Sequence, residues 1–351
     1  MPNDPLLTLA TDALPEPSPP PAPAARSPWR SVARTVGLYA ITIWAVVTIV
    51  FLLPRAIPGD PLQHLDDPDS GAFVEDSRSR ELAMAYYGLD RPLLDQYRLY
   101  LSGLVDGDLG WSISQRAPVG ELIGRRLPWT LLLVGSSMLL ASAVSFVAGV
   151  SAAWRRGSVT DKALIVSLAG TRAVPEYAIA SALLILFAVT WPVLPMAGGQ
   201  TAFARYPNGW EAAKDVFNHL VLPMSSLTLG LAANQFLIVR NSAISTLGED
   251  YMLLARAKGL PPRLLKYRHS GRNVLLPFLT AFGVQVGFAV SASLFVEKVF
   301  SYPGIGTLID SAVTARDYPL LQGLFVMLAL VVIAANFLVD LAYKWVDPRV
   351  A

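Results

Sequence analysis

The chain has 351 residues, of which 53% are hydrophobic and only 15% are charged, and its mean hydropathy is +0.46. Soluble domains usually carry about a quarter charged residues, so this composition predicts a membrane protein. The sequence contains no cysteine, which excludes disulfides, thiolate catalysis and cysteine metal sites. The net charge of +2 is too small to indicate a nucleic-acid partner.

The first segment, residues 1–28, is rich in proline and alanine. It cannot bury a core, so we expect a disordered cytoplasmic tail. An apolar run follows and ends at Leu53, before Pro54 and Arg55. A secretory signal would have a shorter apolar core and a cleavage site soon after it. Residues 29–54 are therefore predicted to be a retained first transmembrane helix.

Six windows approach the length of about 20 apolar residues that a helix needs to cross the hydrocarbon core of a bilayer. They are, approximately, Val36–Leu53, Trp129–Trp154, Ala163–Trp191, Leu220–Val239, Val274–Val296 and Leu320–Ala342. The fold class predicted from them is an all-α integral membrane protein with six transmembrane helices.

Two connections between these windows are long. Residues 55–128 join the first two windows, and residues 240–273 form a basic segment between the fourth and fifth. The distribution of Lys and Arg predicts that both termini are cytoplasmic. Residues 55–128 are then extracytoplasmic, and residues 129–351 form the core transmembrane domain.

The basic segment contains the stretch EDYMLLARAKGLPP, residues 249–262. It predicts a short helix with acids at its start and bases at its end, which suits the helix dipole. Glycine is typical of the position that stops such a helix, and two prolines prevent its continuation. The residues alone leave two interpretations open, a helix that docks on a cytosolic partner and an ordinary solvated loop helix. The candidate docking residues are Glu249, Asp250, Ala255, Ala257, Lys258 and Gly259.

This stretch resembles the coupling (EAA) loop of ABC importer permeases, and other blocks resemble the dipeptide/oligopeptide/nickel permease family. Those blocks are PRAIPGDP (Pro54–Pro61), YGLDRPLLDQY (Tyr87–Tyr97), GDLGWS (Gly107–Ser112), APVGELIGRRLPWTL (Ala117–Leu131), HLVLP (His219–Pro223), RNVLLP (Arg272–Pro277), VEKVFSYPGIG (Val296–Gly306), RDYPLLQG (Arg316–Gly323) and NFLVDLAYKWVDPR (Asn336–Arg349). The resemblance covers about residues 30–350 in register.

The resemblance implies a type I ABC importer permease in a bacterial or archaeal inner membrane, with peptide as the expected cargo. It implies a second homologous permease subunit, two cytosolic ATPases on the coupling helices, and an extracytoplasmic substrate-binding protein. The chain has no G-x-x-x-x-G-K-[ST] phosphate loop. We therefore expect no cofactor and no ATPase site in this chain, with ATP and Mg²⁺ bound by the partner ATPases.

Arg172 and Glu176 are charged residues inside the third window, and Arg172 is about 15 Å along the helix from Lys162. Charges at membrane depth are costly and usually face a cavity or each other. Pro175 lies between them and predicts a kink. Two interpretations are open. The charges line the pathway and contact the termini or backbone of a peptide, or they form a structural ion pair against the partner subunit.

The remaining candidate pathway or gate residues are polar or acidic. Asn234, Gln235 and Gln285 lie in the fourth and fifth windows, where they would face the pathway or form hydrogen bonds between helices. Glu297 matches the family motif at the outer end of the fifth window and is a candidate gate residue, or else a water-exposed carboxylate. His64 stands among flexible aspartates, which gives poor metal geometry, so no metal site is expected.

The alternatives to peptide import are import of nickel chelates or other small solutes by the same machinery, a secondary transporter and a membrane enzyme. Secondary transporters tend to show inverted repeats and paired intramembrane ion sites, and we find no repeat. A membrane enzyme needs a nucleophile–base or metal constellation within the spans, and we find none there.

Overall fold

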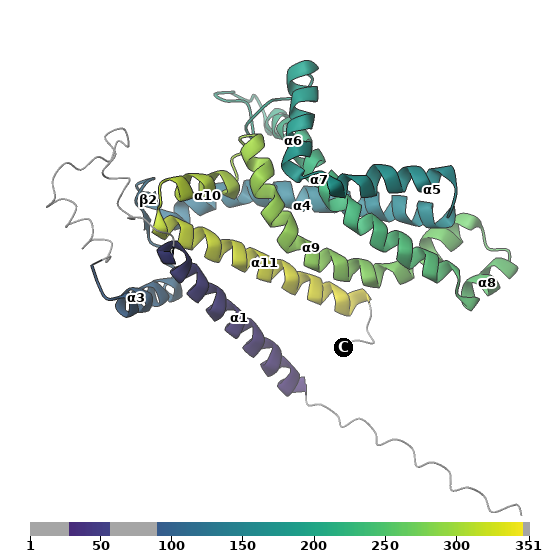
Figure 1. The fold of residues 1–351 in the computed structure, drawn as a ribbon, viewed down its shortest axis with the longest axis horizontal. Helices are drawn as coiled ribbons and strands as arrows, with labels where there is room; N and C mark the ends of the chain where they lie inside the picture. The colour runs from purple at the N-terminus through teal and green to yellow at the C-terminus, as the bar shows by residue number, and fades with distance from the viewer. Residues whose placement is uncertain (1–27, 57–89, 347–351) are drawn as a thin grey trace, which may run out of the picture. The chain divides into compact units, whose positions relative to one another are not determined.

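The computed structural model describes residues 28–56 and 90–346, with side chains described for residues 37–53, 55–56 and 90–342 (Figure 1). The predicted tail, except Pro28, lies outside the described residues, and so does His64. The chain divides into two units, residues 1–45 and residues 46–351. Helix α1 (Pro28–Ala56) begins in the first unit and ends in the second. Its apolar stretch, Gly37–Leu53, contains most of the first predicted window.

The second unit is built on four helices that are long and apolar enough to cross a membrane, and they run side by side in Figure 1. They are α4 (Val119–Trp154), α7 (Gly209–Leu247), α9 (Gly271–Val299) and α11 (Tyr318–Val346). A π-helical stretch, η7 (Leu264–Ser270), leads into α9. The four windows predicted for these helices are confirmed.

These helices extend beyond the apolar windows. Helix α7 begins at Gly209 because Asn208 caps it, accepting a hydrogen bond at 2.9 Å from the backbone of Glu211. Helix α4 begins at Val119 and continues through Pro128, where the sequence predicted the start of the second span. Prolines inside membrane helices are tolerated because neighbouring groups satisfy the freed backbone. Hydropathy therefore located the apolar middle of each helix and missed its polar ends.

The third window does not form the single kinked helix that the sequence predicts. It consists of α5 (Val159–Leu164), the π-helical η4 (Ile165–Ala169), the 3-10 helix η5 (Gly170–Ala173), α6 (Glu176–Leu184) and the π-helical η6 (Ile185–Thr190). The chain bends by 106° between the two halves. Pro175 has no N–H and forces the preceding residue into an extended conformation, and Val174 has φ −109° and ψ 125°. The chain therefore breaks where a kink was expected.

An ion pair fastens the first half of this broken span to α7. The guanidinium of Arg240 donates two hydrogen bonds to the carboxylate of Asp161, at 2.7 and 2.8 Å. The backbone N–H of Gly157 donates to the same carboxylate at 2.9 Å. The Asp161 side chain is only 3% exposed and that of Arg240 15%. The pair is therefore largely shielded from solvent and holds α5 in place.

The short elements gather at the two ends of the long helices. At one end lie α3 (Leu93–Val105), the antiparallel pair β1 (Trp111–Ser112) and β2 (Ala117–Pro118), and α10 (Ile305–Thr314). Buried Asp317 joins them to α11, because it accepts from the Ser112 hydroxyl at 2.6 Å and from the Leu320 backbone at 3.1 Å. At the other end α8 (Asp250–Ala257) stands between α7 and η7.

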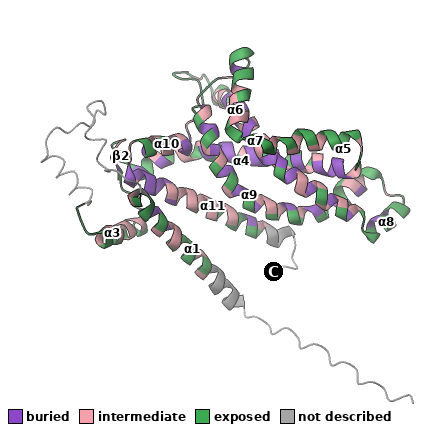
Figure 2. Ribbon diagram, in the orientation of Figure 1, coloured by how far each residue is buried: buried purple, intermediate pink, exposed green. Residues whose placement is uncertain are grey.

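Buried residues concentrate on the sides of α4, α7 and α9 that face one another, while large apolar residues remain exposed on the outer sides (Figure 2). Val147 of α4 is 54% exposed and Phe217 of α7 is 57% exposed. Helices α4 and α7 approach so closely that a Cβ added at Gly149 would lie 2.7 Å from a methyl group of Val239. Close approach at small residues with apolar outer faces is typical of helices packed in lipid.

We expect Asp161→Asn to lower the free energy of unfolding by about 3 kcal/mol, because removing one partner leaves the other charge buried and unpaired. The measurement is thermal unfolding of the detergent-purified protein. Asp95→Asn is the matched control, since the ion pair of Asp95 with Arg98 is exposed and should contribute about 0.5 kcal/mol or less. Equal melting temperatures for the two variants would contradict the anchoring role of Asp161.

Candidate functional site

The break in the third span opens a cavity of about 550 Å³ against α7 and α9. Four of the predicted pathway residues line it, Arg172, Glu176, Asn234 and Gln285. The other lining residues are Thr171, Ala173, Val174, Pro175, Gly230, Leu231, Phe288, Ser291, Ala292 and Phe295. Polar and charged side chains from three separate segments therefore meet at one cavity.

Two contacts fix the break against α7. The Thr171 hydroxyl lies 3.0 Å from the backbone carbonyl of Leu229, which accepts its hydrogen bond. Gly230 leaves room for the side chain of Glu176, because a Cβ at that position would lie 3.0 Å from the Cγ of Glu176. The absence of a side chain at Gly230 therefore lets the start of α6 lie close to α7.

Arg172 and Glu176 do not form an ion pair with each other or with any other group in the described part of the chain. Both residues are exposed. Their i,i+4 spacing would bring them together on a continuous helix, but the extended backbone at Val174 removes that geometry. Both charges are instead free to contact water or a solute in the cavity.

The amide of Gln285 crosses from α9 to α7. Its Nε2 donates to the backbone carbonyl of Leu231 at 2.7 Å, so the predicted interhelical hydrogen bond is present. Its Oε1 is buried and accepts no hydrogen bond from any described residue. A neighbouring cavity of about 420 Å³ shares Asn234, Gln285 and Phe288 with the first, so the hollow continues along α7 and α9.

Gln235 and Glu297 do not line this cavity. Gln235 follows Asn234 by one residue, which turns it about 100° around the helix, and it is fully buried. Buried Glu297 accepts from the Thr130 hydroxyl at 2.7 Å and from the backbone of Gly306 at 2.5 Å. The interpretation of Glu297 as a water-exposed carboxylate is therefore wrong, because the turn after α9 folds over it. A Cβ at Gly304 would lie 2.3 Å from its carboxyl carbon.

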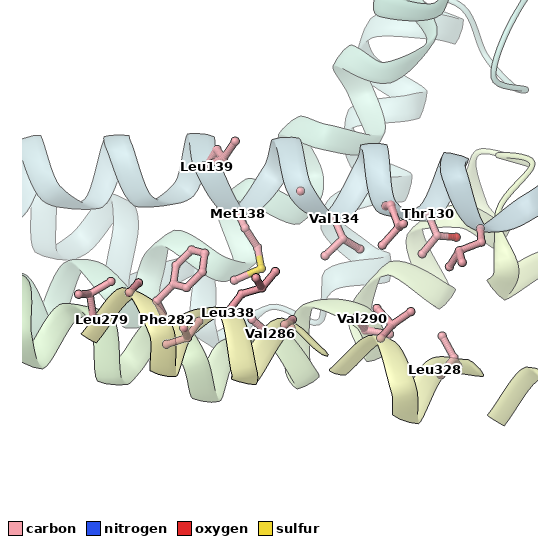
Figure 3. A pocket seen from close by; sticks show the side chains of 17 residues that line it. Thr130, Val134, Met138, Leu139, Leu279, Phe282, Val286, Val290, Leu328 and Leu338 are labelled. Carbon is pink, nitrogen blue, oxygen red and sulfur yellow. The ribbon is translucent and has the colours of Figure 1, made fainter. Parts of the chain in front are cut away.

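A separate cavity of about 390 Å³ lies among α4, α9 and α11. Figure 3 shows Val134 and Met138 of α4 directed toward Phe282 and Val286 of α9 across it. Its lining contains no charged side chain, and the hydroxyl of its Thr130 is bonded to Glu297. This apolar cavity does not suit a charged solute.

The second candidate region is α8, which has the capped geometry that the sequence predicts. Glu249 occupies the position before its first residue, Asp250 lies in its first turn, and Gly259 has φ +69° just beyond its end. Such left-handed backbone favours glycine. The candidate residues Ala257 and Lys258 are exposed, and the exposed side of the helix also carries Tyr251, Leu253, Leu254 and Arg256.

Ala255 differs from the expectation for a docking residue. Met252 and Ala255 are three residues apart, which places them on one face of α8. Ala255 is buried there, and it packs with Met252 and with Leu265 of η7. It therefore packs α8 onto its own chain and does not lie on the exposed side of the helix.

Some cavity residues were missed from the sequence. Phe288 and Phe295 follow Gln285 at helical spacing on α9, and Ser291 lies between them. This periodicity was available in the sequence and marks one face of the helix. Thr171 and Gly230 carried no such signal, because their roles depend on contacts between segments that are far apart in the chain.

Comparisons with known proteins decide the family. The family model of the binding-protein-dependent transport system inner membrane component matches residues 145–351. The chain belongs to this family. The permease is also 34% identical over 336 residues to the di/tripeptide transport system permease protein DppB of Pseudomonas aeruginosa, with 91% of this chain and 98% of that protein covered. It is 34% identical over 320 residues to the glutathione transport system permease protein GsiC of Escherichia coli O6:H1, covering 91% and 97%.

Among solved structures, a chain of the MetNI methionine ABC transporter in inward-facing conformations has a TM-score of 0.49 and 17% identity, and covers 64% of this chain and 96% of that chain. The resemblance to ABC importer permeases that the sequence predicted is confirmed by the family match and the two relatives. The chain is a multi-pass permease subunit of an importer and belongs to a permease family, not to an ATPase family.

Proposed function

We propose that this permease forms half of the translocation pathway for short peptides, and that the cavity at the break of the third span lies on that pathway. The observation that carries the proposal is the convergence of Arg172, Glu176, Asn234 and Gln285 on one cavity. Intramembrane ionisable residues usually face a substrate pathway or one another, and these two are not paired. Peptide as cargo is supported by the relatives that transport di- and tripeptides and glutathione.

The partners proposed are a second homologous permease, two cytosolic ATPases and an extracytoplasmic substrate-binding protein. The description of the family as binding-protein-dependent supports the last of these. The second permease and the two ATPases follow from the architecture of ABC importers, in which each permease subunit contacts one ATPase. ATP and Mg²⁺ are bound by the ATPases, and both termini of this chain are cytoplasmic, as the Lys and Arg distribution indicates.

Helix α8 is proposed to dock on an ATPase. Its inner side is committed to its own chain through Met252 and Ala255, so movement of α8 would be passed to α7 and η7. Its outer side exposes two leucines, Leu253 at 57% and Leu254 at 58%, next to basic residues. Exposed apolar side chains with a charged rim are typical of a protein contact.

The test of the proposal is reconstitution of the co-purified complex into proteoliposomes with labelled tripeptide outside and ATP inside. Uptake should require ATP, the ATPases, the binding protein and this permease. Uptake of peptide by this chain alone, driven by an ion gradient without ATPases, would contradict the proposal and favour a secondary transporter.

We expect Gly259→Asp to reduce peptide uptake roughly tenfold or more while the complex still hydrolyses ATP, because an unpaired charge in a docking surface costs several kcal/mol. Apart from its chain neighbours, no described residue has an atom within 4 Å of a Cβ at this position, so the added side chain meets open space. Gly259→Asn is the matched control, since asparagine has the same shape, tolerates left-handed backbone and carries no charge. Uptake by Gly259→Asp equal to that of the asparagine control would count against docking here.

A further inference from the structure

The cavity at the break holds one positive and one negative side chain, Arg172 and Glu176, and transport of a peptide does not by itself require either. In the part of the chain that the structure describes, neither takes part in an ion pair. Charges at membrane depth are costly unless water or an opposite charge stabilises them. Two opposite charges on one wall, kept apart by the extended backbone at Val174, are complementary to a ligand that carries both signs.

A third residue, Gln285, holds the wall of the cavity in place beside these charges. Gln285 is only 5% exposed, lines the same cavity, and has a buried Oε1 with no donor among the described residues. Its Nε2 is bonded to the carbonyl of Leu231, which fixes the orientation of the amide and leaves Oε1 as an acceptor. Because Oε1 is buried, a ligand in the cavity does not reach it, and Gln285 acts by fixing α9 against α7 beside the two charges.

We infer that this cavity binds short peptides as zwitterions, with Arg172 at the C-terminal carboxylate and Glu176 at the N-terminal ammonium. The guanidinium fork matches a carboxylate with two parallel hydrogen bonds. Exposed Asn234 carries both a donor and an acceptor for the peptide bond between the two ends. The inference rests on the proposed transport of peptides and adds the recognition of both free termini.

The volume of the cavity agrees with this ligand class. A cavity of about 550 Å³ is within the range of roughly 300–1,000 Å³ that small-molecule sites occupy. Peptides blocked at one end lose one of the two charged contacts, so the cavity would discriminate free peptides from N-acetylated and C-amidated ones.

The experiment measures initial uptake rates of trialanine, its N-acetyl derivative and its C-terminal amide by the complete reconstituted complex at subsaturating concentration. Each variant is compared with the unaltered complex on the same peptide, so the preference of the binding protein cancels in the ratio. This design is a double-mutant cycle between a side chain of the permease and a terminus of the peptide.

Arg172→Gln is expected to slow uptake of trialanine and of the N-acetyl peptide about tenfold or more, and to leave the amide unchanged, because the amide has no carboxylate to lose. Glu176→Gln is expected to slow trialanine and the amide by a similar factor, and to leave the N-acetyl peptide unchanged. Lys162→Gln and Glu211→Gln remove the same charges from exposed positions outside the cavity and should change no ratio.

Variants that slow all three peptides by the same factor would overturn the inference and indicate pairing of these charges with the partner subunit. Variants that slow none would overturn it as well. If the unaltered complex transports none of the three peptides, the proposed function fails, and the inference with it. Should a glutamine variant not assemble, Arg172→Lys and Glu176→Asp keep the charge, and the same peptide-specific pattern is expected at roughly threefold, because a lysine lacks the planar fork and an aspartate has a shorter reach.

Discussion

Pro175 has no backbone N–H to donate, and its ring keeps Val174 out of the helical conformation. The third window therefore breaks into two halves with a bend of 106° between them, and the cavity lies at that break. A continuous helix would have placed Arg172 and Glu176 one turn apart, where they could neutralise each other. The break separates them and presents both charges to the same hollow.

The rest of the fold holds this break in position. Asp161 and Arg240 fasten the first half of the span to α7, and Thr171 bonds to the backbone of α7 just before the break. Gln285 then ties α9 to the same stretch of α7 through the carbonyl of Leu231. The cavity thus lies where three segments are joined by polar contacts. Helix α8 follows α7 directly along the chain, so the end of α7 connects the proposed docking helix to the wall of the cavity.

Much of this arrangement could be predicted from the sequence. Apolar windows located the spans, glycine and proline located the end of α8, and the proline between two charges located the distortion of the third span. The angle of the break could not be predicted, because a proline alone does not decide between a kink and a break. The partners of Asp161 and Glu297 were also hidden, because Arg240 and Thr130 are distant in sequence. The sequence could not decide whether Asn234 or Gln235 lines the pathway, because that depends on the orientation of α7 about its own axis.

The natural absence of cysteine makes a direct test possible, because an introduced thiol is then the only one in the chain. Ser291→Cys lies in the cavity wall at an exposed position, and Val144→Cys lies at an exposed apolar position of α4 that lines neither this cavity nor the apolar one. The decisive measurement is the rate at which a membrane-impermeant thiol reagent labels each variant in the assembled complex, with and without transported peptide. The account predicts that Ser291→Cys is labelled, that peptide slows the labelling, and that Val144→Cys is not labelled. Labelling of Ser291→Cys that is absent, or that peptide does not change, would contradict the placement of this cavity on the path of the solute.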